Sequence, residues 1–548
     1  MSRATLLHAT FALAIAALAA VLYGPFLGNP LVFDDKIFFS GRRFAYYATH
    51  PLGLDLRLPP YFSLTITQVL SGSIVAHRVI SLILHIGVAL ALYKLLLDLQ
   101  RTTLRPADER DFALRAGIGA AAFALHPVAV YGAAYLVQRS IVMATLFGLL
   151  SAVLFLRGVR RGSHADAITA ALLYTLAVLS KEHAVLLPAA ILPALVLAGT
   201  ARRFALRHAA IYLAACAPAA LFVTLRSLGV IGGVYEEGVG AIAEQVSAAS
   251  GEDILQRSLA LSAVTQAGLF FQYLGAWLWP SPAAMSIDVR VDFVAGWSAG
   301  WIAAKIAAFA ATGGLGVWLL LRRGAASLAG FGLLYAWLLF IVEFAAVRFQ
   351  EPFVLYRSYL WGPGVLCIGV AILSRLTRPG VIAAGALACA ILGYAAHARL
   401  VTFSDPLRLW EDAAAKLPDR PVPWGSRTLY SLGREYLYAG QPDKAIAATE
   451  RCMRLYPKTV QCVYARGVVH LQMHEYARAT EHLNRALALE PGSAIMHHRL
   501  GLALECLGRN EDAEASYRRA QALGYGGGLI ELQRLQAPGA RRRPPACG

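Results

Sequence analysis

Charged residues are scarce in this sequence. Asp, Glu, Lys and Arg make up 15% of its 548 residues, 57% are hydrophobic, and the mean hydropathy is +0.54. Since ordinary soluble domains carry about 25% charged residues, the composition excludes a single soluble globular domain. It predicts a polytopic membrane protein, which needs long apolar segments and few charges.

Cysteine is scarce as well. The seven cysteines are too few and too scattered for a disulfide scaffold, and no CxxC pair indicates a metal knuckle. Cys452 and Cys462 are close enough in sequence to pair in an oxidising compartment, but two unpaired helical thiols are the interpretation that we favour.

Acidic residues are outnumbered, with 33 Asp and Glu against 50 Lys and Arg and a formal net charge of +17. A basic protein suggests nucleic-acid binding, but here the arginines cluster in short loops between apolar runs, which is typical of cytoplasmic loops. We therefore expect membrane lipids, and no nucleic acid, as partners of these residues. The clusters are Arg101, Arg105 and Arg110; Arg157, Arg160 and Arg161; Arg202, Arg203 and Arg207; Arg322 and Arg323; and Arg375 and Arg378.

The long apolar runs predict eleven membrane spans, near residues 5–27, 77–99, 113–128, 140–157, 166–181, 184–200, 207–229, 298–321, 326–347, 360–375 and 379–398. These spans keep the N-terminus and every basic cluster in the cytoplasm and place the loop after the first span outside. A further candidate at 259–279 would export Arg322 and Arg323, so we expect a re-entrant or interfacial helix there. If the first run is instead a cleaved signal peptide, the loop still lies outside.

From about residue 401 dense charge and helical amphipathicity replace continuous apolarity. Three sets of residues there recur with a period of 34: Gly433, Gly467 and Gly501; Ala445, Ala479 and Ala513; and Cys452, Ala486 and Ala520. This pattern resembles the tetratricopeptide repeat, in which small residues let two antiparallel helices approach closely. The sequence predicts a membrane domain at 1–400, three repeats at 401–525, and a cap with a basic tail at 526–548.

Because the last span leads outward, we expect the repeats on the extracytoplasmic side. Stacked helix pairs form a concave surface, so we favour a role in docking a peptide or protein. The alternative is that these helices only brace the membrane domain.

Polar side chains collect at the predicted outer ends of the spans, where charged groups are costly and usually functional. The first outer loop, NPLVFDDKIFFSG at 29–41, carries Asp34 and Asp35 among large apolar residues. Taken singly, each later residue has a simple structural explanation, such as snorkelling to lipid headgroups or capping a helix. The candidate residues besides the two acids are Arg57, His126, Gln138, Arg139, Lys181, Glu182, His183, Glu351, Tyr356, Arg357 and Tyr359.

Together these residues predict a polar cavity with an acidic part and a cationic part. Burial near apolar walls raises the pKa of a carboxyl group and suits it to act as a general base. Fixed Arg and Lys side chains can neutralise a phosphate that leaves during group transfer. The pattern indicates a transferase for a lipid-phosphate-linked group, with one acid for chemistry and the other for positioning.

Several motifs in fixed order resemble one family. They are FDD at 33–35, FALHPV with a later QR at 123–139, SKEHA at 180–184, YLGAWLWPSPAAMSID at 273–288, YRSYL at 356–360, and DPLRLWEDAAAKLP at 405–418 before the repeats. The set resembles the transmembrane and tetratricopeptide-repeat glycosyltransferases, within the wider GT-C class that includes the protein O-mannosyltransferases. The resemblance covers nearly the whole chain.

This resemblance implies an all-α fold: a GT-C-type membrane domain followed by a tetratricopeptide α-solenoid. It also implies transfer of a sugar from a polyprenyl-phosphate donor to a protein hydroxyl on the extracytoplasmic face, usually with inversion. The repeats would dock the acceptor protein or peptide.

The resemblance also implies roles for single residues. Asp34 would be the catalytic base, and Asp35 would help to hold the acceptor, as a Glu does in the similar FDE-type loop of the mannosyltransferases. The candidates for the donor phosphate are Arg139, Lys181 and Arg357. Arg57, His126, Gln138, Glu182, His183, Tyr356 and Tyr359 would shape the cavity. Residues 128–131 lack the acid that often follows the HP pair, which leaves sugar and acceptor preference open.

A cofactor is not required by this interpretation. The adjacent Asp34 and Asp35 offer oxygen ligands for Mg²⁺ or Mn²⁺, as in some oligosaccharyl members of the class. The mannosyltransferase-like loop instead implies metal-free chemistry, which we favour.

Two other functions stay open. One is an envelope polysaccharide polymerase or ligase that uses the same carrier, and the other is a non-catalytic assembly scaffold or transporter subunit. A transporter is expected to hold polar groups at mid-membrane depth, whereas the ionisable residues here gather at one face. The Ala- and Arg-rich composition suggests a GC-rich bacterium, hence a multi-pass inner-membrane protein with periplasmic repeats.

Overall fold

The computed structural model describes residues 3–40, 42–50, 53, 55–104, 108–233, 258–291, 299–348, 351–536 and 547. Over these residues it contains helices and no strands, which confirms the predicted all-α fold. The chain forms two compact units, which are described separately. The bundle unit is Met1–Ile287 with Phe293–Asp405, and the repeat unit is Asp288–Asp292 with Pro406–Gly548.

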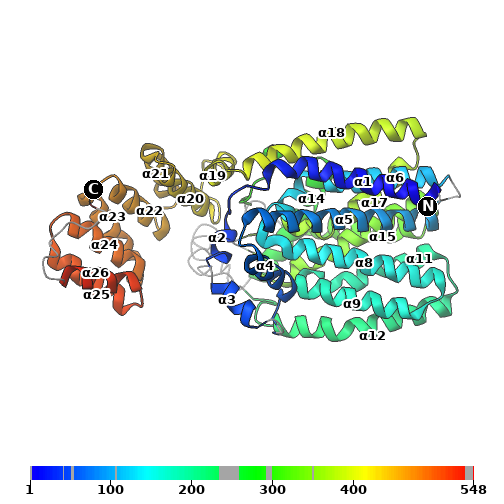
Figure 1. The fold of residues 1–548 in the computed structure, drawn as a ribbon, viewed down its shortest axis with the longest axis horizontal. Helices are drawn as coiled ribbons and strands as arrows, with labels where there is room; N and C mark the ends of the chain where they lie inside the picture. Colours follow the sequence, from blue (N-terminus) through cyan, green and yellow to red (C-terminus); the bar gives the residue numbers. More distant parts are fainter. Residues whose placement is uncertain are drawn as a thin grey trace. The chain divides into compact units, whose positions relative to one another are not determined.

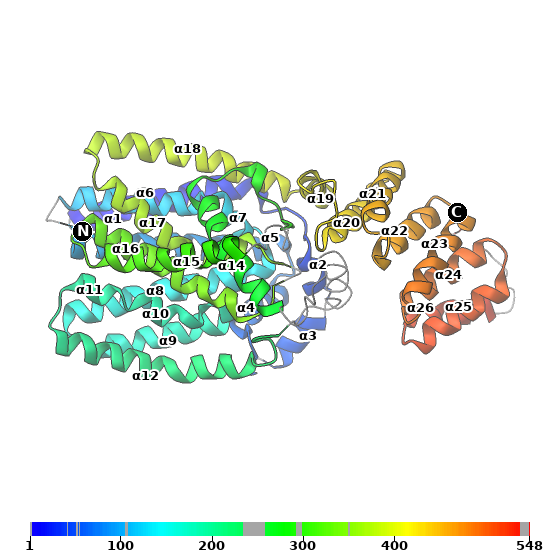
Figure 2. The same ribbon diagram turned by 180° about the vertical axis from the view of Figure 1, so that it is seen from behind.

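Long apolar helices of the bundle unit run side by side (Figures 1 and 2), and the short helices α2 (Asp34–Phe38) and α3 (Arg42–Thr49) lie at the end opposite the N-terminus. The other helices are α1 (Arg3–Tyr23), α4 (Leu58–Leu70), α5 (Ile74–Thr103), α6 (Glu109–Ala124), α7 (Pro127–Ala133), α8 (Arg139–Arg161), α9 (His164–Ser180), α10 (Leu187–Ile191), α11 (Ala194–Ala198), α12 (Arg202–Arg226), α14 (Ser258–Leu278), α15 (Ala299–Leu320), α16 (Ala325–Phe340), α17 (Gly362–Leu373) and α18 (Arg378–Thr402).

Eight helices in the described part of the chain are long and apolar enough to cross a membrane, or nine if α6 and α7, bent by 62°, form one span. The sequence predicted eleven. The runs at 166–181, 184–200 and 360–375 form shorter apolar helices. In the second of these, Pro188 and Pro193 fall where the helix breaks, because proline lacks the N–H that a continuous helix needs.

Helix α14 was predicted to be re-entrant or interfacial, although its length and composition suffice for a span. Its side chains contact the residues between α16 and α17 along most of its length. Four of its side chains donate hydrogen bonds there: Ser262 to Ala346 O at 3.4 Å, Gln266 to Pro352 O at 2.8 Å, Tyr273 to Val354 O at 3.1 Å and Trp277 to Ser358 Oγ at 3.0 Å. These contacts fix α14 against the residues that connect α16 to α17.

Two glycines allow a close helix crossing in this region. Gly332 in α16 and Gly364 in α17 face each other, and a Cβ on either residue would overlap the backbone of the other. Small residues at such a crossing let two helix backbones approach closely, which positions the segment between these helices.

The repeat unit consists of three helix pairs between α19 (Pro406–Ala415) and α26 (Gly526–Gln536). The pairs are α20 (Gly425–Tyr438) with α21 (Pro442–Leu455), α22 (Val460–Gln472) with α23 (Tyr476–Leu489), and α24 (Ala494–Cys506) with α25 (Asn510–Ala522). Within each pair a glycine touches the partner helix, because a Cβ at Gly433, Gly467 or Gly501 would lie within 2.9 Å of Thr449, Leu483 or Tyr517. The period of 34 residues thus reflects close helix packing. Of the predicted basic tail, only Cys547 lies within the described residues.

One carboxylate from within the membrane-domain sequence belongs to the repeat unit. Asp288 is buried, and it accepts hydrogen bonds from Arg427 Nη2 at 2.6 Å and Thr428 Oγ1 at 2.7 Å, both in α20. Asp288 is therefore fixed to the first repeat by hydrogen bonds, of which the one from Arg427 is charge-assisted.

The cysteine prediction was wrong. Disulfides join Cys452 to Cys462 and Cys506 to Cys547, whose Cα atoms lie 5.5 and 5.4 Å apart, while Cys216, Cys367 and Cys389 are free thiols. The turn between α21 and α22 brings the first pair into bonding range, which cysteine count and spacing did not reveal.

Loss of the first disulfide is expected to destabilise the repeat unit. The double substitution Cys452→Ala, Cys462→Ala should lower its unfolding free energy by about 2–4 kcal/mol, because the bond no longer constrains the unfolded chain. Thermal unfolding of the full-length protein, with and without reductant, measures this effect. Cys216→Ala is the control, and equal behaviour of the two variants would contradict the prediction.

Candidate functional site

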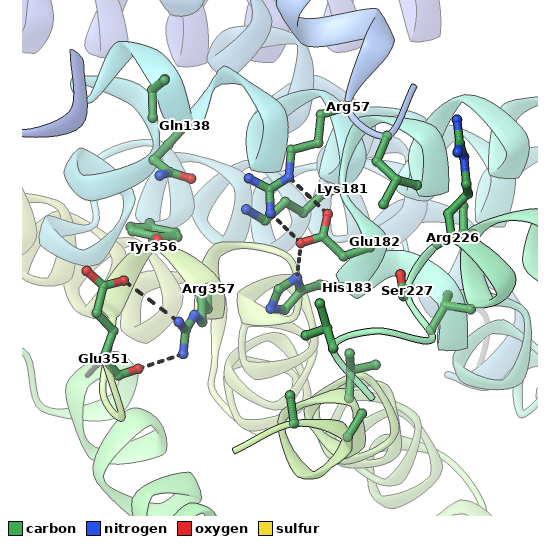
Figure 3. Close-up of a pocket in the computed structure, with 18 of the residues that line it drawn as sticks. Arg57, Gln138, Lys181, Glu182, His183, Arg226, Ser227, Glu351, Tyr356 and Arg357 are labelled. Atoms are coloured by element: carbon green, nitrogen blue, oxygen red, sulfur yellow. Dashed lines mark hydrogen bonds and ion pairs between the residues drawn. The ribbon is translucent and has the colours of Figure 1, made fainter. Parts of the chain in front are cut away.

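A polar cavity of about 660 Å³ lies in the bundle unit, at the end that carries α2 and α3. Figure 3 shows most of its charged side chains converging from loops that are far apart in sequence. Nine of the thirteen candidate residues line it: Asp34, Arg57, Gln138, Lys181, Glu182, His183, Glu351, Tyr356 and Arg357.

Short 3₁₀ helices carry much of the lining: η2 (Leu136–Gln138), η3 (Glu182–Leu186), η5 (Ile341–Ala345) and η6 (Leu355–Tyr359). Each lies where a long apolar helix begins or ends. Irregular backbone at a membrane border is tolerated where it is buried in protein or lines a polar cavity. Polar residues consequently replace the continuous apolar sequence at these four 3₁₀ helices.

Asp34 is the first residue of α2, and its side chain lines the cavity. The residue before it, Phe33, has φ 47° and ψ −122°, a strained conformation for a bulky side chain. The Asp34 N–H donates a hydrogen bond to Tyr135 Oη at 3.0 Å. Backbone strain of this kind concentrates at functional sites, so it marks Asp34 as a candidate reactive acid.

Asp35 lies beneath the cavity and does not line it. Its carboxylate is fully buried and accepts hydrogen bonds from the N–H groups of Val137 at 2.8 Å and Leu136 at 3.3 Å. Burial raises the pKa of Asp35 to about 7, against the opposing effects of these amides and of Arg78. Asp35 thus ties the first loop to η2 and is not among the residues that line the cavity.

Arg57 and Glu182 form a two-bonded ion pair across the cavity, with Nε to Oε2 at 3.0 Å and Nη2 to Oε1 at 2.5 Å. Glu182 raises the pKa of Arg57, which has φ 64° at the start of α4. The charge of this arginine is therefore already compensated by a carboxylate.

Lys181 differs from its neighbours. Its side chain is 4% exposed, and its ammonium lies 5.8 Å from the centre of the Tyr356 ring. The Lys181 ammonium makes neither a hydrogen bond nor an ion pair with any residue that the structure describes. Burial, followed by the nearby Arg57, lowers the pKa of Lys181 to about 7. An anion in the cavity would stabilise its charged form.

Arg357 is held at the opposite wall by two acidic residues. It lies 3.3 Å from Glu343 Oε2 and 3.9 Å from Glu351 Oε2, and it donates a hydrogen bond to the backbone oxygen of Glu351 at 2.9 Å. The guanidinium is thus fixed in direction at the cavity surface.

The other predicted residues lie outside the lining. Arg139, predicted to bind phosphate, is fully buried on the first turn of α8. It donates to Ser81 Oγ, Ser63 Oγ, Thr67 Oγ1 and His77 O at 3.3, 3.0, 3.4 and 2.8 Å. These contacts explain its buried charge as a link between α4, α5 and α8.

His126 and Tyr359, predicted to shape the cavity, also have other partners. The His126 ring stacks on Trp277 at 4.3 Å and accepts a hydrogen bond from Val128 N–H at the start of α7. Tyr359 Oη is hydrogen-bonded to His85 Nδ1 at 2.6 Å in the interior. Both side chains support the helices behind the cavity.

Sequence reasoning missed other residues of the site, among them Arg43, Arg226 and Arg348 in the lining and Glu343 behind it. Two signals were present. Glu343 is an acid inside the predicted span 326–347, where an acid is expensive. Arg226 lies at the outer end of an apolar run, where the positive-inside rule predicts few basic residues.

The carboxylates do not fit a divalent cation held by Asp34 and Asp35 together. Asp35 accepts from two backbone amides, and the nearest ion pair of Glu182 is with Arg57. Among the described residues, no group of three or more His, Cys, Asp and Glu side chains is arranged to hold a metal ion.

Comparisons with known proteins identify the repeats. Tetratricopeptide repeat models match residues 426–459 and 464–526. BBSome complex member BBS4 from Xenopus tropicalis is 31% identical over 120 residues, 22% of each chain, and its Mus musculus counterpart is 28% identical over 130 residues, 24% of each chain. The matched part of this chain thus spans only about a quarter of the length of these curated relatives.

Among solved structures, MamA is 23% identical with a TM-score of 0.21, covering 25% of this chain and 78% of that one. An Archaeoglobus fulgidus oligosaccharyltransferase is 15% identical with a TM-score of 0.38, covering 82% of this chain and 59% of that one. Similarity at this level says nothing about activity.

Removing the Asp35 carboxylate is expected to destabilise the bundle unit. Asp35→Ala leaves the buried Leu136 N–H and the partly buried Val137 N–H without an acceptor, which should cost about 1–3 kcal/mol. Asp55→Ala, which removes an acid bonded to exposed Tyr46 Oη, is the control and should change stability by less than about 0.5 kcal/mol. Thermal unfolding in detergent compares the two variants. Equal stability would show that the Asp35 carboxylate does not stabilise the contact between the first loop and η2.

Proposed function

We propose that the protein is a membrane glycosyltransferase that moves a sugar from a polyprenyl-phosphate donor to a hydroxyl group of an acceptor protein. One observation carries the proposal: Asp34, Lys181 and Arg357, which come from segments far apart in sequence, line the same cavity. An acid and fixed cations in one cavity are what acceptor activation and departure of a phosphate require.

In the proposed reaction, the acceptor hydroxyl oxygen forms a bond to the anomeric carbon of the sugar. The bond from that carbon to the phosphate oxygen breaks, and its electron pair leaves with the polyprenyl phosphate. The hydroxyl proton passes to Asp34. Attack from the face opposite the leaving group inverts the anomeric centre.

Lys181 and Arg357 are the proposed phosphate contacts, and Arg139 is not, because it lies outside the cavity. The phosphodiester of the donor carries one negative charge and gains a second as it leaves. The buried Lys181 ammonium can match that charge, since no described residue forms an ion pair with it. This transfer needs no metal ion, so we propose a metal-free reaction.

The cavity end is proposed to face the extracytoplasmic side, in a bacterial inner membrane. Disulfides persist in oxidising compartments, and both lie in the repeat unit, while the free thiols lie in the bundle unit. Helix α18, which leads into that unit, ends at the cavity end, because Asn29 Nδ2 in the first loop donates to Leu400 O at 3.3 Å.

The repeat unit is proposed to dock the acceptor protein. Stacked repeats of this type form extended concave binding surfaces, and the repeat models cover most of the unit. An acceptor peptide held there would be presented on the same side of the membrane as Asp34.

Asp34→Asn tests the proposed base. The variant should bind a lipid donor normally and lose at least about 100-fold of the transfer rate, because an amide cannot accept the hydroxyl proton. Asp55→Asn, at the same end of the bundle, is the control. Mass spectrometry of envelope proteins from cells with each variant measures transfer. Normal glycosylation with Asp34→Asn would refute the proposal and favour a non-catalytic scaffold.

Lys181 predicts a pH dependence of donor binding. Since its pKa is lowered to about 7, the side chain is mostly charged at pH 6 and mostly neutral at pH 8. Affinity for farnesyl methyl phosphate, a diester with a fixed single charge, should fall roughly tenfold over this range. Lys181→Arg keeps its charge and should flatten the profile. Asp35 titrates in both proteins, so an identical profile in the variant would exclude Lys181 as a contact.

A further inference from the structure

A buried carboxylate stands directly behind the wall of the polar cavity. Glu343 in η5 is 4% exposed and does not line the cavity, although Val342 and Ala345 on either side of it do. Three side chains surround it at ion-pair distance: Arg357 Nη1 and His183 Nε2 at 3.3 Å, and Arg348 Nε at 3.6 Å. All three belong to the lining.

His183 connects this carboxylate to the other wall. Its Nδ1 lies 3.4 Å from Glu182 Oε1, while its Nε2 faces Glu343. Glu182 in turn holds Arg57. A continuous row of side chains within ion-pair distance therefore runs along the cavity wall, in the order Arg57, Glu182, His183, Glu343 and Arg357, and Glu343 is its one member behind the lining. Figure 3 shows the part of this row from Arg57 to His183.

This row joins segments that have little other regular structure to hold them. His183, Glu343 and Arg357 each lie in a separate 3₁₀ helix, η3, η5 and η6. Such short helices have poor hydrogen-bond geometry. Buried charges are costly unless they are paired, so the side-chain positions depend on one another, and removal of one charge leaves its neighbours uncompensated.

We infer that Glu343 and His183 are positioning residues: they fix Arg357, which contacts the donor phosphate beside Lys181, and they hold the Arg57–Glu182 pair in place at the cavity wall. Glu343 acts through Arg357 and does not touch the donor. This inference takes the identity of the anion from the proposed function. The order that Glu343 and His183 impose on η3 and η6 is independent of that function.

The first experiment measures that order without any ligand. Hydrogen exchange is followed in full-length protein for peptides covering 182–186 and 354–361. These peptides carry the Ala184 and Arg357 amides, which donate to Lys181 O and Val354 O, both at 3.0 Å. Glu343→Gln should speed exchange in both peptides at least threefold. The matched control is Asp98→Asn, a buried carboxylate in α5 paired with Lys94, Arg101 and Arg160, which should leave both peptides unchanged.

The second experiment measures binding of farnesyl methyl phosphate and tests whether Glu343 acts through Arg357. Glu343→Gln should weaken binding about tenfold, and Asp98→Asn should not weaken it. Arg357→Ala with Glu343→Gln should bind no more than twofold worse than Arg357→Ala alone, because Glu343 acts through that arginine. Should Glu343→Gln fail to fold, His183→Gln interrupts the same row and replaces it in both experiments.

Unchanged exchange in Glu343→Gln, equal acceleration by Asp98→Asn, or multiplicative losses of affinity would each overturn the positioning role. If the unmodified protein does not bind the probe, the proposed donor is wrong, and the exchange experiment alone decides whether Glu343 and His183 order the cavity wall.

Discussion

Compensation of buried charge at the end of an apolar bundle is the constraint on which the site depends. A guanidinium or carboxylate removed from water is stable only with a partner, and the cavity provides one for Arg57 in Glu182 and one for Arg357 in Glu343. These pairs bring together segments that no regular secondary structure joins. Lys181 lacks such a partner among the described residues, so an anionic ligand would complete the charge balance of the cavity.

The same constraint explains why adjacent acids differ in environment. Asp34 lines the cavity after a strained residue, whereas Asp35 is buried beneath it and accepts two backbone N–H groups from η2. A carboxylate that satisfies backbone donors fixes the loop, and its neighbour is thereby directed into the cavity. One acid orders the site and the other is available for chemistry.

The sequence predicted much of the site because charged residues are rare in apolar segments. Gln138, Lys181, Glu182, His183, Tyr356 and Arg357 stood out at the ends of apolar runs, and all line the cavity. Arg139 stood out for the same reason but faces Ser63, Ser81 and Thr67 inside the bundle. Rarity identifies a costly charge, but only the direction of the side chain separates a structural partner from a ligand contact.

Composition and periodicity by themselves determined the long apolar segments and the repeats, because apolar length and a 34-residue period are local properties of the chain. The disulfide between Cys452 and Cys462 and the burial of Glu343 against His183 were decided by tertiary structure. Both depend on distances between segments that are separated along the chain or by a turn, and those distances arise only when the helices pack.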